Sequence, residues 1–157
     1  MAITQKIWMG ATAIILVAVV VVAGLQIWNQ TPKDILATAP LDASCDLEAG
    51  PCAANFPEIG QVTFSISPHP IVGLKPLQLK VQAEGMAAQA VDIDFRGLGM
   101  NMGFNRPRLK KISDGEYAGT GTLSVCILER MTWEATVLIS TRDGVFAAPF
   151  RFETIRH

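Results

Sequence analysis

Hydrophobicity alternates with a period of two through most of the chain after Gln61, and this pattern constrains the fold more than any other feature. The clearest runs place apolar side chains at Val62, Phe64 and Ile66, at Leu77, Leu79 and Val81, and at Val91, Ile93 and Phe95. Such alternation is typical of β-strands that bury one face. Further strands are expected in residues 116–126, 132–141 and 145–154.

Turn signals separate these runs, as short antiparallel strands require. They are Pro68 and Pro70, Gly85, Gly97 and Gly99, Asp114 with Gly115, and Asp143 with Gly144. The last pair is a strong signal for a two-residue hairpin. About six or seven strands in residues 61–157 predict an all-β domain, an antiparallel β-sandwich of immunoglobulin-like type.

A long apolar segment precedes this region. Residues 7–27 contain no charge, and Trp8 and Trp28 stand at its ends, where indole rings prefer the membrane interface. About 20 apolar residues match the hydrocarbon thickness of a bilayer. Residues 1–28 are therefore predicted to form one N-terminal transmembrane helix that is retained as an anchor. A cleaved secretory signal and a buried core helix are the alternatives.

The charges that flank this segment predict its orientation. The free amino group and Lys6 precede it, whereas Lys33 after it is neutralised by Asp34. Positive charge is retained on the cytoplasmic side of a membrane. We therefore expect a single-pass protein of a bacterial inner membrane, with its C-terminal domain in the periplasm.

Residues 29–60 are rich in proline, alanine and acidic side chains and lack a sustained periodicity, which predicts an extended tether. Cys45 and Cys52 lie within it, close enough in sequence for a disulfide that would suit an exported compartment. Soft-metal binding or disulfide exchange by this pair is the alternative. Cys126 is either a small buried hydrophobe or the partner of one of the other two cysteines.

Charge and motif content exclude several classes of function. Thirteen basic and fourteen acidic residues leave a net charge of -1, which supplies no field for binding nucleic acid. The chain has no Gly-x-Ser-x-Gly elbow, no phosphate-binding glycine loop and no His-Glu-x-x-His motif. His69 and His157 have no catalytic companions nearby in sequence, and Asp92 and Asp94 share the wet face of a strand. We do not expect an enzyme.

Residues 97–105, with the sequence GLGMNMGFN, form the most distinctive segment. Met100 and Met102 are two apart, which places both thioethers on one face of an extended backbone. Thioether and thiolate ligands select Cu(I), so this segment is a candidate metal site. The candidate ligands are Met100, Met102, Cys126 and Met131, with Met86 and His69 as further candidates. The alternative is that the methionines fill gaps in the core.

A basic cluster lies beside this segment in the sequence. Its members are Arg96, Arg106, Arg108, Lys110 and Lys111. Arg106, Arg108 and Lys110 are the candidate partner-binding residues, since such a cluster can steer an acidic partner or contact anionic lipid head groups. The alternative is an ordinary solvated face.

Three short motifs occur in a fixed order: Met100-x-Met102-Gly103, then Asp114-Gly115-x-Tyr117-x-Gly119, then Met131-x-Trp133. In this order, residues 61–155 resemble the YtkA-like and FixH-like periplasmic modules. The resemblance implies a membrane-anchored β-sandwich found with copper proteins and with haem-copper oxidase assembly. Asn105 departs from it, standing near where many relatives have a histidine.

Two functions are therefore expected. The first is a periplasmic accessory protein that helps the assembly, metallation or stability of a respiratory copper enzyme, with Cu(I) as its candidate cofactor. A haem-copper oxidase or another respiratory complex is the expected partner. The alternative is a metal-free interaction module, or a structural accessory subunit of a membrane complex.

Overall fold

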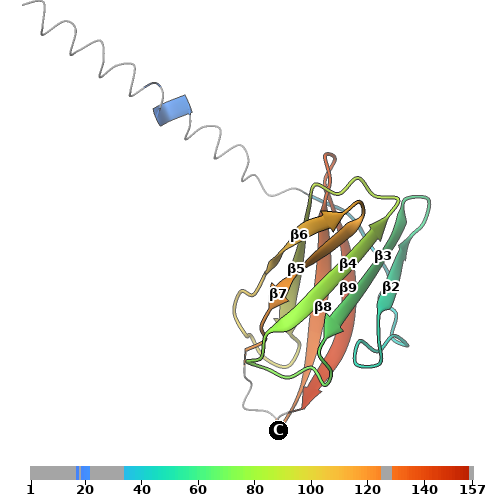
Figure 1. The fold of residues 1–157 in the computed structure, drawn as a ribbon, viewed down its shortest axis with the longest axis vertical. Helices are drawn as coiled ribbons and strands as arrows, with labels where there is room; N and C mark the ends of the chain where they lie inside the picture. The colour runs from blue at the N-terminus through green and yellow to red at the C-terminus, as the bar shows by residue number, and fades with distance from the viewer. Residues whose placement is uncertain (1–16, 18, 22–33, 125–128, 156–157) are drawn as a thin grey trace, which may run out of the picture. The chain divides into compact units, whose positions relative to one another are not determined.

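Nine β-strands occur among the residues that a computed structural model of this protein describes (Figure 1). The structure describes residues 17, 19–21, 34–124 and 129–155. The strands are β1 (Ile35–Thr38), β2 (Cys52–Phe56), β3 (Gly60–Ser67), β4 (Leu77–Glu84), β5 (Ala90–Gly97), β6 (Arg108–Ser113), β7 (Glu116–Gly121), β8 (Arg130–Ser140) and β9 (Val145–Ile155). All of them belong to one compact unit, Asp34–His157.

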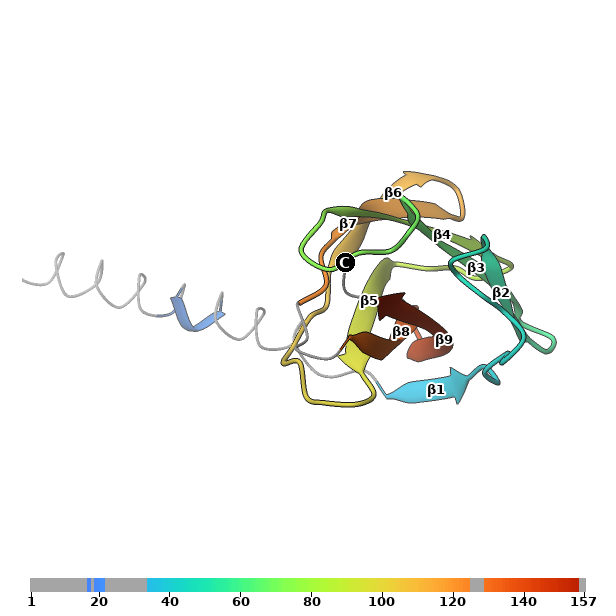
Figure 2. The same cartoon turned by 90° about the horizontal axis from the view of Figure 1, so that it is seen from below.

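The strands join in one mixed sheet, in the order β1-β9-β8-β5-β6-β7-β4-β3-β2. Each neighbouring pair is antiparallel except β1 and β9, which are parallel. Because β6 pairs with β5 on one side and with β7 on the other, it links the two halves of the sheet. Figure 2 shows the half that contains β5, β8, β9 and β1 facing the half that contains β7, β4, β3 and β2.

The core lies between these halves and follows the alternation in the sequence. In β4, every second side chain from Leu77 onward is buried and the others are exposed. Aromatic rings bridge the halves: Phe64 of β3 and Phe150 of β9 have ring centroids 5.6 Å apart. Trp133 is fully buried, and its Nε1 donates a 3.0 Å hydrogen bond to Thr154 Oγ1, which satisfies the one polar atom of the indole.

The structure has more strands than the alternation predicts, and one pair is parallel. Two of the additional strands, β1 and β2, lie in residues 34–60, which the sequence pattern assigned to an extended tether. In β2 the inward positions are Cys52, Ala54 and Phe56, so small side chains conceal the alternation. The partner of β1 is more than a hundred residues away in sequence. A pattern within a short window cannot reveal that pairing.

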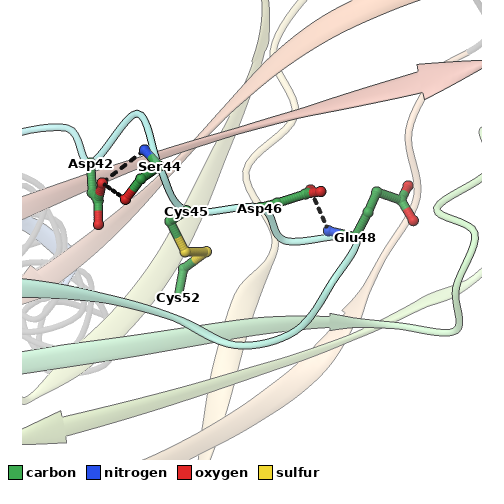
Figure 3. The surroundings of a disulfide bond; sticks show 6 residues. All are labelled: Asp42, Ser44, Cys45, Asp46, Glu48 and Cys52. Atoms are coloured by element: carbon green, nitrogen blue, oxygen red, sulfur yellow. Dashed lines mark hydrogen bonds between the residues drawn. A yellow bond between two sulfur atoms is a disulfide. The ribbon is translucent and has the colours of Figure 1, made fainter.

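The segment between β1 and β2 is fastened by a disulfide between Cys45 and Cys52, whose Cα atoms are 5.8 Å apart (Figure 3). Short hydrogen bonds shape the segment: Asp42 Oδ1 accepts from the N–H and the hydroxyl of Ser44, at 2.8 and 2.6 Å. Leu47 is fully buried in the core. The segment is therefore a packed wall of the domain.

The predicted anchor, residues 1–28, falls mostly outside the described residues. Of this segment the structure describes residues 17 and 19–21, which are helical. Within the described part of the chain, no helix has both the length and the apolar character needed to cross a membrane.

Candidate functional site

Two methionines of the predicted metal site, Met102 and Met131, meet at the end of β5. Gly97 ends this strand, and a β-carbon built there would collide with Met131 Cε and would lie 2.9 Å from Met102 Cγ. It would also lie 3.0 Å from the backbone oxygen of Met100. Glycine at position 97 therefore makes room for two thioether side chains that arrive from β8 and from the loop after β5.

These methionines differ in their exposure to solvent. Met131 is 2% exposed, Met102 packs against the core, and Met100 is exposed. Two of the predicted ligands, Met102 and Met131, are thus brought together on the apolar side. Their arrangement fits the interpretation that methionines fill irregular space in a core.

The other candidate ligands lie elsewhere. Cys126 falls outside the described residues. His69 Nδ1 is 3.5 Å from Glu48 Oε2, and Met86 precedes β5, at the opposite end of that strand from Gly97. Across the described residues, no group of three or more histidine, cysteine, aspartate or glutamate side chains is placed to hold a metal ion.

The loop at residues 98–107 is held firmly along the side of β5. Phe95 N donates to Asn105 O at 2.9 Å, and Ile93 N donates to Pro107 O at 3.0 Å. The Asn105 side-chain amide donates a 2.7 Å hydrogen bond to Thr122 O. Asn105, which stands near where many YtkA-like and FixH-like modules have a histidine, therefore has a structural role. These bonds fix the loop on the domain.

This anchored loop presents apolar side chains to solvent. Phe104 is 83% exposed, and Leu98 and Met100 are also exposed. The Arg106 guanidinium carbon lies 5.2 Å from the centroid of the Phe104 ring, within the range of a cation–π contact. Large apolar groups exposed on a loop that is held in place are a common feature of interaction sites.

A chain of ion pairs crosses the outer face of β5, β8 and β9 beside this loop. Arg106 Nε donates to Asp94 Oδ1 at 3.1 Å, and Arg96 Nη2 donates to Glu134 Oε1 at 2.7 Å. Arg151 Nε donates to the other oxygen of Glu134 at 3.2 Å. The strand register creates this chain, because residue 96 is paired with residue 134, and residue 134 with residue 151.

The carboxylates of these ion pairs lie close to the sheet, and the guanidinium groups lie farther out, toward solvent. The side chains of Asp94 and Glu134 are 18% and 11% exposed, whereas that of Arg96 is 62% exposed. We call this surface the arginine face; its cations are Arg96, Arg106, Arg108 and Arg151. This face exposes guanidinium groups to solvent, and each of them is hydrogen-bonded to a carboxylate.

Arg108 extends the arginine face onto β6. It donates hydrogen bonds of 2.8 and 3.2 Å to the two oxygens of Asp92, and those bonds, with the attraction between the charges, raise the pKa of Arg108 above its ordinary value. Lys110, next along the same side of β6, is exposed and makes no ion pair within the described part of the chain. Lys111 instead bonds Asp114 at 2.7 Å.

The sequence pattern singled out three of the four arginines of this surface but not the ion pairs that they form. Asp92 and Asp94 were assigned to solvent, and Glu134 and Arg151 were not singled out. The alternation does contain the signal that Glu134 faces outward, because it does not fall among the apolar, inward positions of its strand. The residues paired with it on the neighbouring strands face outward as well. Recognising the pairs requires the strand order, which the alternation does not contain.

Comparison with known proteins adds no relative to this picture. No family model, no curated protein and no solved structure matches the chain.

Proposed function

We propose that this chain is a membrane-anchored periplasmic interaction module, an accessory subunit of a membrane complex whose immunoglobulin-like β-sandwich docks on a partner. The observation that supports it best is the anchored loop beside the arginine face, with Phe104 exposed over Arg106. Aromatic and arginine side chains are the residues most enriched at the energetic centres of protein interfaces. The apolar segment at residues 7–27 supports the anchor.

The chemistry of this surface defines the partner. Phe104 and Leu98 need an apolar pocket to cover them, while the guanidiniums and Lys110 favour acidic groups around that pocket. Because the arginines already bond carboxylates, Lys110 is the cation most available to a partner. The resemblance to YtkA-like and FixH-like modules supports a haem-copper oxidase or another respiratory complex as this partner.

A site-specific crosslink tests the proposal. A photoreactive phenylalanine analogue at position 104 of the full chain, in native membranes, should crosslink one subunit of a respiratory complex, identified by mass spectrometry. Lys110→Glu should reduce that crosslink several-fold. The matched control places the analogue at Gln78, which is exposed on β4 in the other half of the sheet. Equal crosslinking from positions 104 and 78 would overturn the assignment of this surface.

A second function, Cu(I) binding in the assembly of a respiratory copper enzyme, is supported by a separate observation. The Met102 and Met131 side chains converge at Gly97, and Met100 follows in the same loop. Thioethers from two elements that meet at one point are the ligand type that Cu(I) prefers. Cys126 is a fourth candidate ligand from the sequence.

Titration of the full chain with Cu(I), under ascorbate and with a chromophoric competitor, tests this function. The wild-type chain should bind one Cu(I) with a dissociation constant below about one micromolar. Met100→Leu with Met102→Leu should weaken that binding at least tenfold, and Met86→Leu, at the opposite end of β5, should leave it unchanged. The metal function fails if the wild-type chain does not compete, or if the double variant binds as the wild type does.

A further inference from the structure

The parallel pairing of β1 with β9 stops early and leaves most of β9 without a neighbour on that side. β1 is in register with residues 145–147, and among the strands that the structure describes no other lies on that side of β9. The last bond between them runs from Ala39 N to Ala147 O, at 2.9 Å. Residues 148–155 therefore form a free sheet edge.

The direction of the backbone groups along this edge follows from the bonds at its start. Val145 N donates to Asp34 O at 3.0 Å, and Ala147 O accepts from Ala39. Peptide groups of alternate residues point to the same side of a strand. Pro149 belongs to the same alternate set of residues as Val145 and Ala147. Its lack of an N–H group is tolerated because no described strand pairs with β9 on that side at this position. Arg151 and Glu153 therefore direct their N–H and C=O groups away from β8.

These groups are available for pairing. Across the described residues, the backbone of neither Arg151 nor Glu153 bonds another segment on this side. Unpaired backbone groups on a strand edge are a template for an incoming strand. The free part of β9 is long enough for an extended segment of about six residues, at about 3.4 Å per residue.

A groove of about 650 Å³ lies beside the last part of this free edge, at residues 151–155. One wall is β9, through Arg151, Glu153 and Ile155. The opposite wall is the segment after β1, which leaves β9 at Ala39 and contributes Cys45. Because Cys45 is bonded to Cys52 of β2, the disulfide attaches this wall to the other half of the sheet. The groove is thus built into the fold.

The groove is acidic. Asp42, Asp46 and Glu48 line the wall opposite β9. The hydrogen bonds from the side chain and the backbone of Ser44 lower the pKa of Asp42, because they favour its charged form. On the β9 wall, Glu153 is paired with Arg130 at 2.6 Å and Arg151 with Glu134 at 3.2 Å, so neither adds a free charge. Asp42 and Asp46 therefore give the groove its negative charge, together with Glu48, which also accepts from Ile71 N and lies 3.5 Å from His69 Nδ1.

We propose that this edge binds a basic, extended segment of a partner protein, which adds to β9 as a further strand. Its backbone would pair with Arg151 and Glu153, which is the recognition mode known as β-strand addition. Its lysine or arginine side chains would face Asp42, Asp46 and Glu48, and apolar side chains would contact Ile155 and the edge of Phe152. This site uses neither Phe104 nor Lys110 and is independent of the function proposed above.

The direct test is fluorescence anisotropy of the full chain with a fluorescein-labelled peptide of seven alternating lysine and valine residues. Glu153→Pro removes the N–H that points into the groove and leaves the bonds to β8 in place, so it should weaken binding at least tenfold. Glu153→Ala, the matched control, loses the same carboxylate and keeps the N–H, so binding should change less than threefold. Equal binding by the two variants would overturn the proposal.

A second probe leaves the protein unchanged, which keeps the test decisive if the proline variant does not fold. The same peptide with every backbone amide N-methylated retains its side chains and charge, and it should bind at least tenfold more weakly. A peptide with glutamate in place of lysine should also bind at least tenfold more weakly. Equal binding of either analogue overturns the proposal. So does self-association of the chain that Glu153→Pro abolishes, because the edge would then pair with a second copy.

Discussion

The Arg96 guanidinium donates a 2.7 Å hydrogen bond to the Glu134 carboxylate, which links the outer faces of β5 and β8. Glu134 also accepts from Arg151 of β9, so one carboxylate joins three strands. It is 9% exposed, and its neutralisation would leave two guanidiniums close together without an anion between them. The arginine face therefore contributes to stability as well as presenting charge to solvent.

Glu134→Gln should lower the free energy of unfolding by about 1 to 2 kcal/mol, because hydrogen bonds to charged groups contribute this much and solvent screens the exposed arginines. Urea denaturation followed by tryptophan fluorescence measures the change. Glu84→Gln, on an exposed position of β4, is the matched control and should change it by less than about 0.5 kcal/mol. Equal effects of the two variants would show that the ion-pair chain adds nothing.

Gly97→Ala should destabilise the protein by about 1 to 3 kcal/mol, because the added β-carbon collides with Met131 Cε in a packed region. The same change in a Met131→Leu background should cost less, since leucine lacks that terminal methyl group. Gly50→Ala is the control, because a β-carbon there meets nothing within 4 Å. Denaturation of the wild type, Gly97→Ala, Met131→Leu and the variant with both changes completes a double-mutant cycle, and a coupling energy of zero would contradict the convergence at Gly97.

Replacing both Cys45 and Cys52 by serine should cost about 2 to 3 kcal/mol, the loop-closure contribution of a disulfide that spans so short a segment. Urea denaturation with and without reductant measures it. Reductant should destabilise the wild-type chain to a similar extent and leave the double variant unaffected. Because Cys126 is the one cysteine left in the double variant, no disulfide within that chain remains to be reduced. If reductant leaves the wild-type chain unaffected, the Cys45–Cys52 bond does not form in solution.

The Lys111–Asp114 pair should make stability depend on pH at both ends of the range. The bond to Lys111 lowers the pKa of Asp114, so this stabilisation is present above the ordinary carboxyl pKa and is lost as pH falls through the lowered value. The pair raises the pKa of Lys111, so the same contact is lost as pH rises through that value. NMR titration should show the pKa of Asp114 moving up in Lys111→Met; an unchanged pKa would exclude the pair in solution.

Much of the domain follows from the sequence. The alternation places Val62, Phe64 and Ile66 in the core of β3, and Asp143 with Gly144 marks the turn between β8 and β9. The disulfide also follows, because Cys45 and Cys52 are close in sequence and nothing between them prevents closure. These features depend on neighbours in the chain.

The features that escaped prediction depend on residues far apart in the sequence. The alternation cannot show that Arg96 meets Glu134, because that contact needs the order and register of β5 and β8. It cannot show that Met131 reaches Gly97, which depends on the same pairing. The edge of β9 was missed for a related reason: β1 is four residues long, mostly exposed and without a clear pattern.

The pairing of β1 with β9 also has a consequence for biosynthesis. A ribosome makes residues 35–38 more than a hundred residues before residues 145–147, so β1 must wait that long for β9, its partner among the described strands. Strand pairs with such long separation form late in folding. The Cys45–Cys52 bond closes within a segment made soon after β1 and does not have to wait for β9. A nascent chain can thus acquire one wall of the groove before the strand that forms the other wall has been translated.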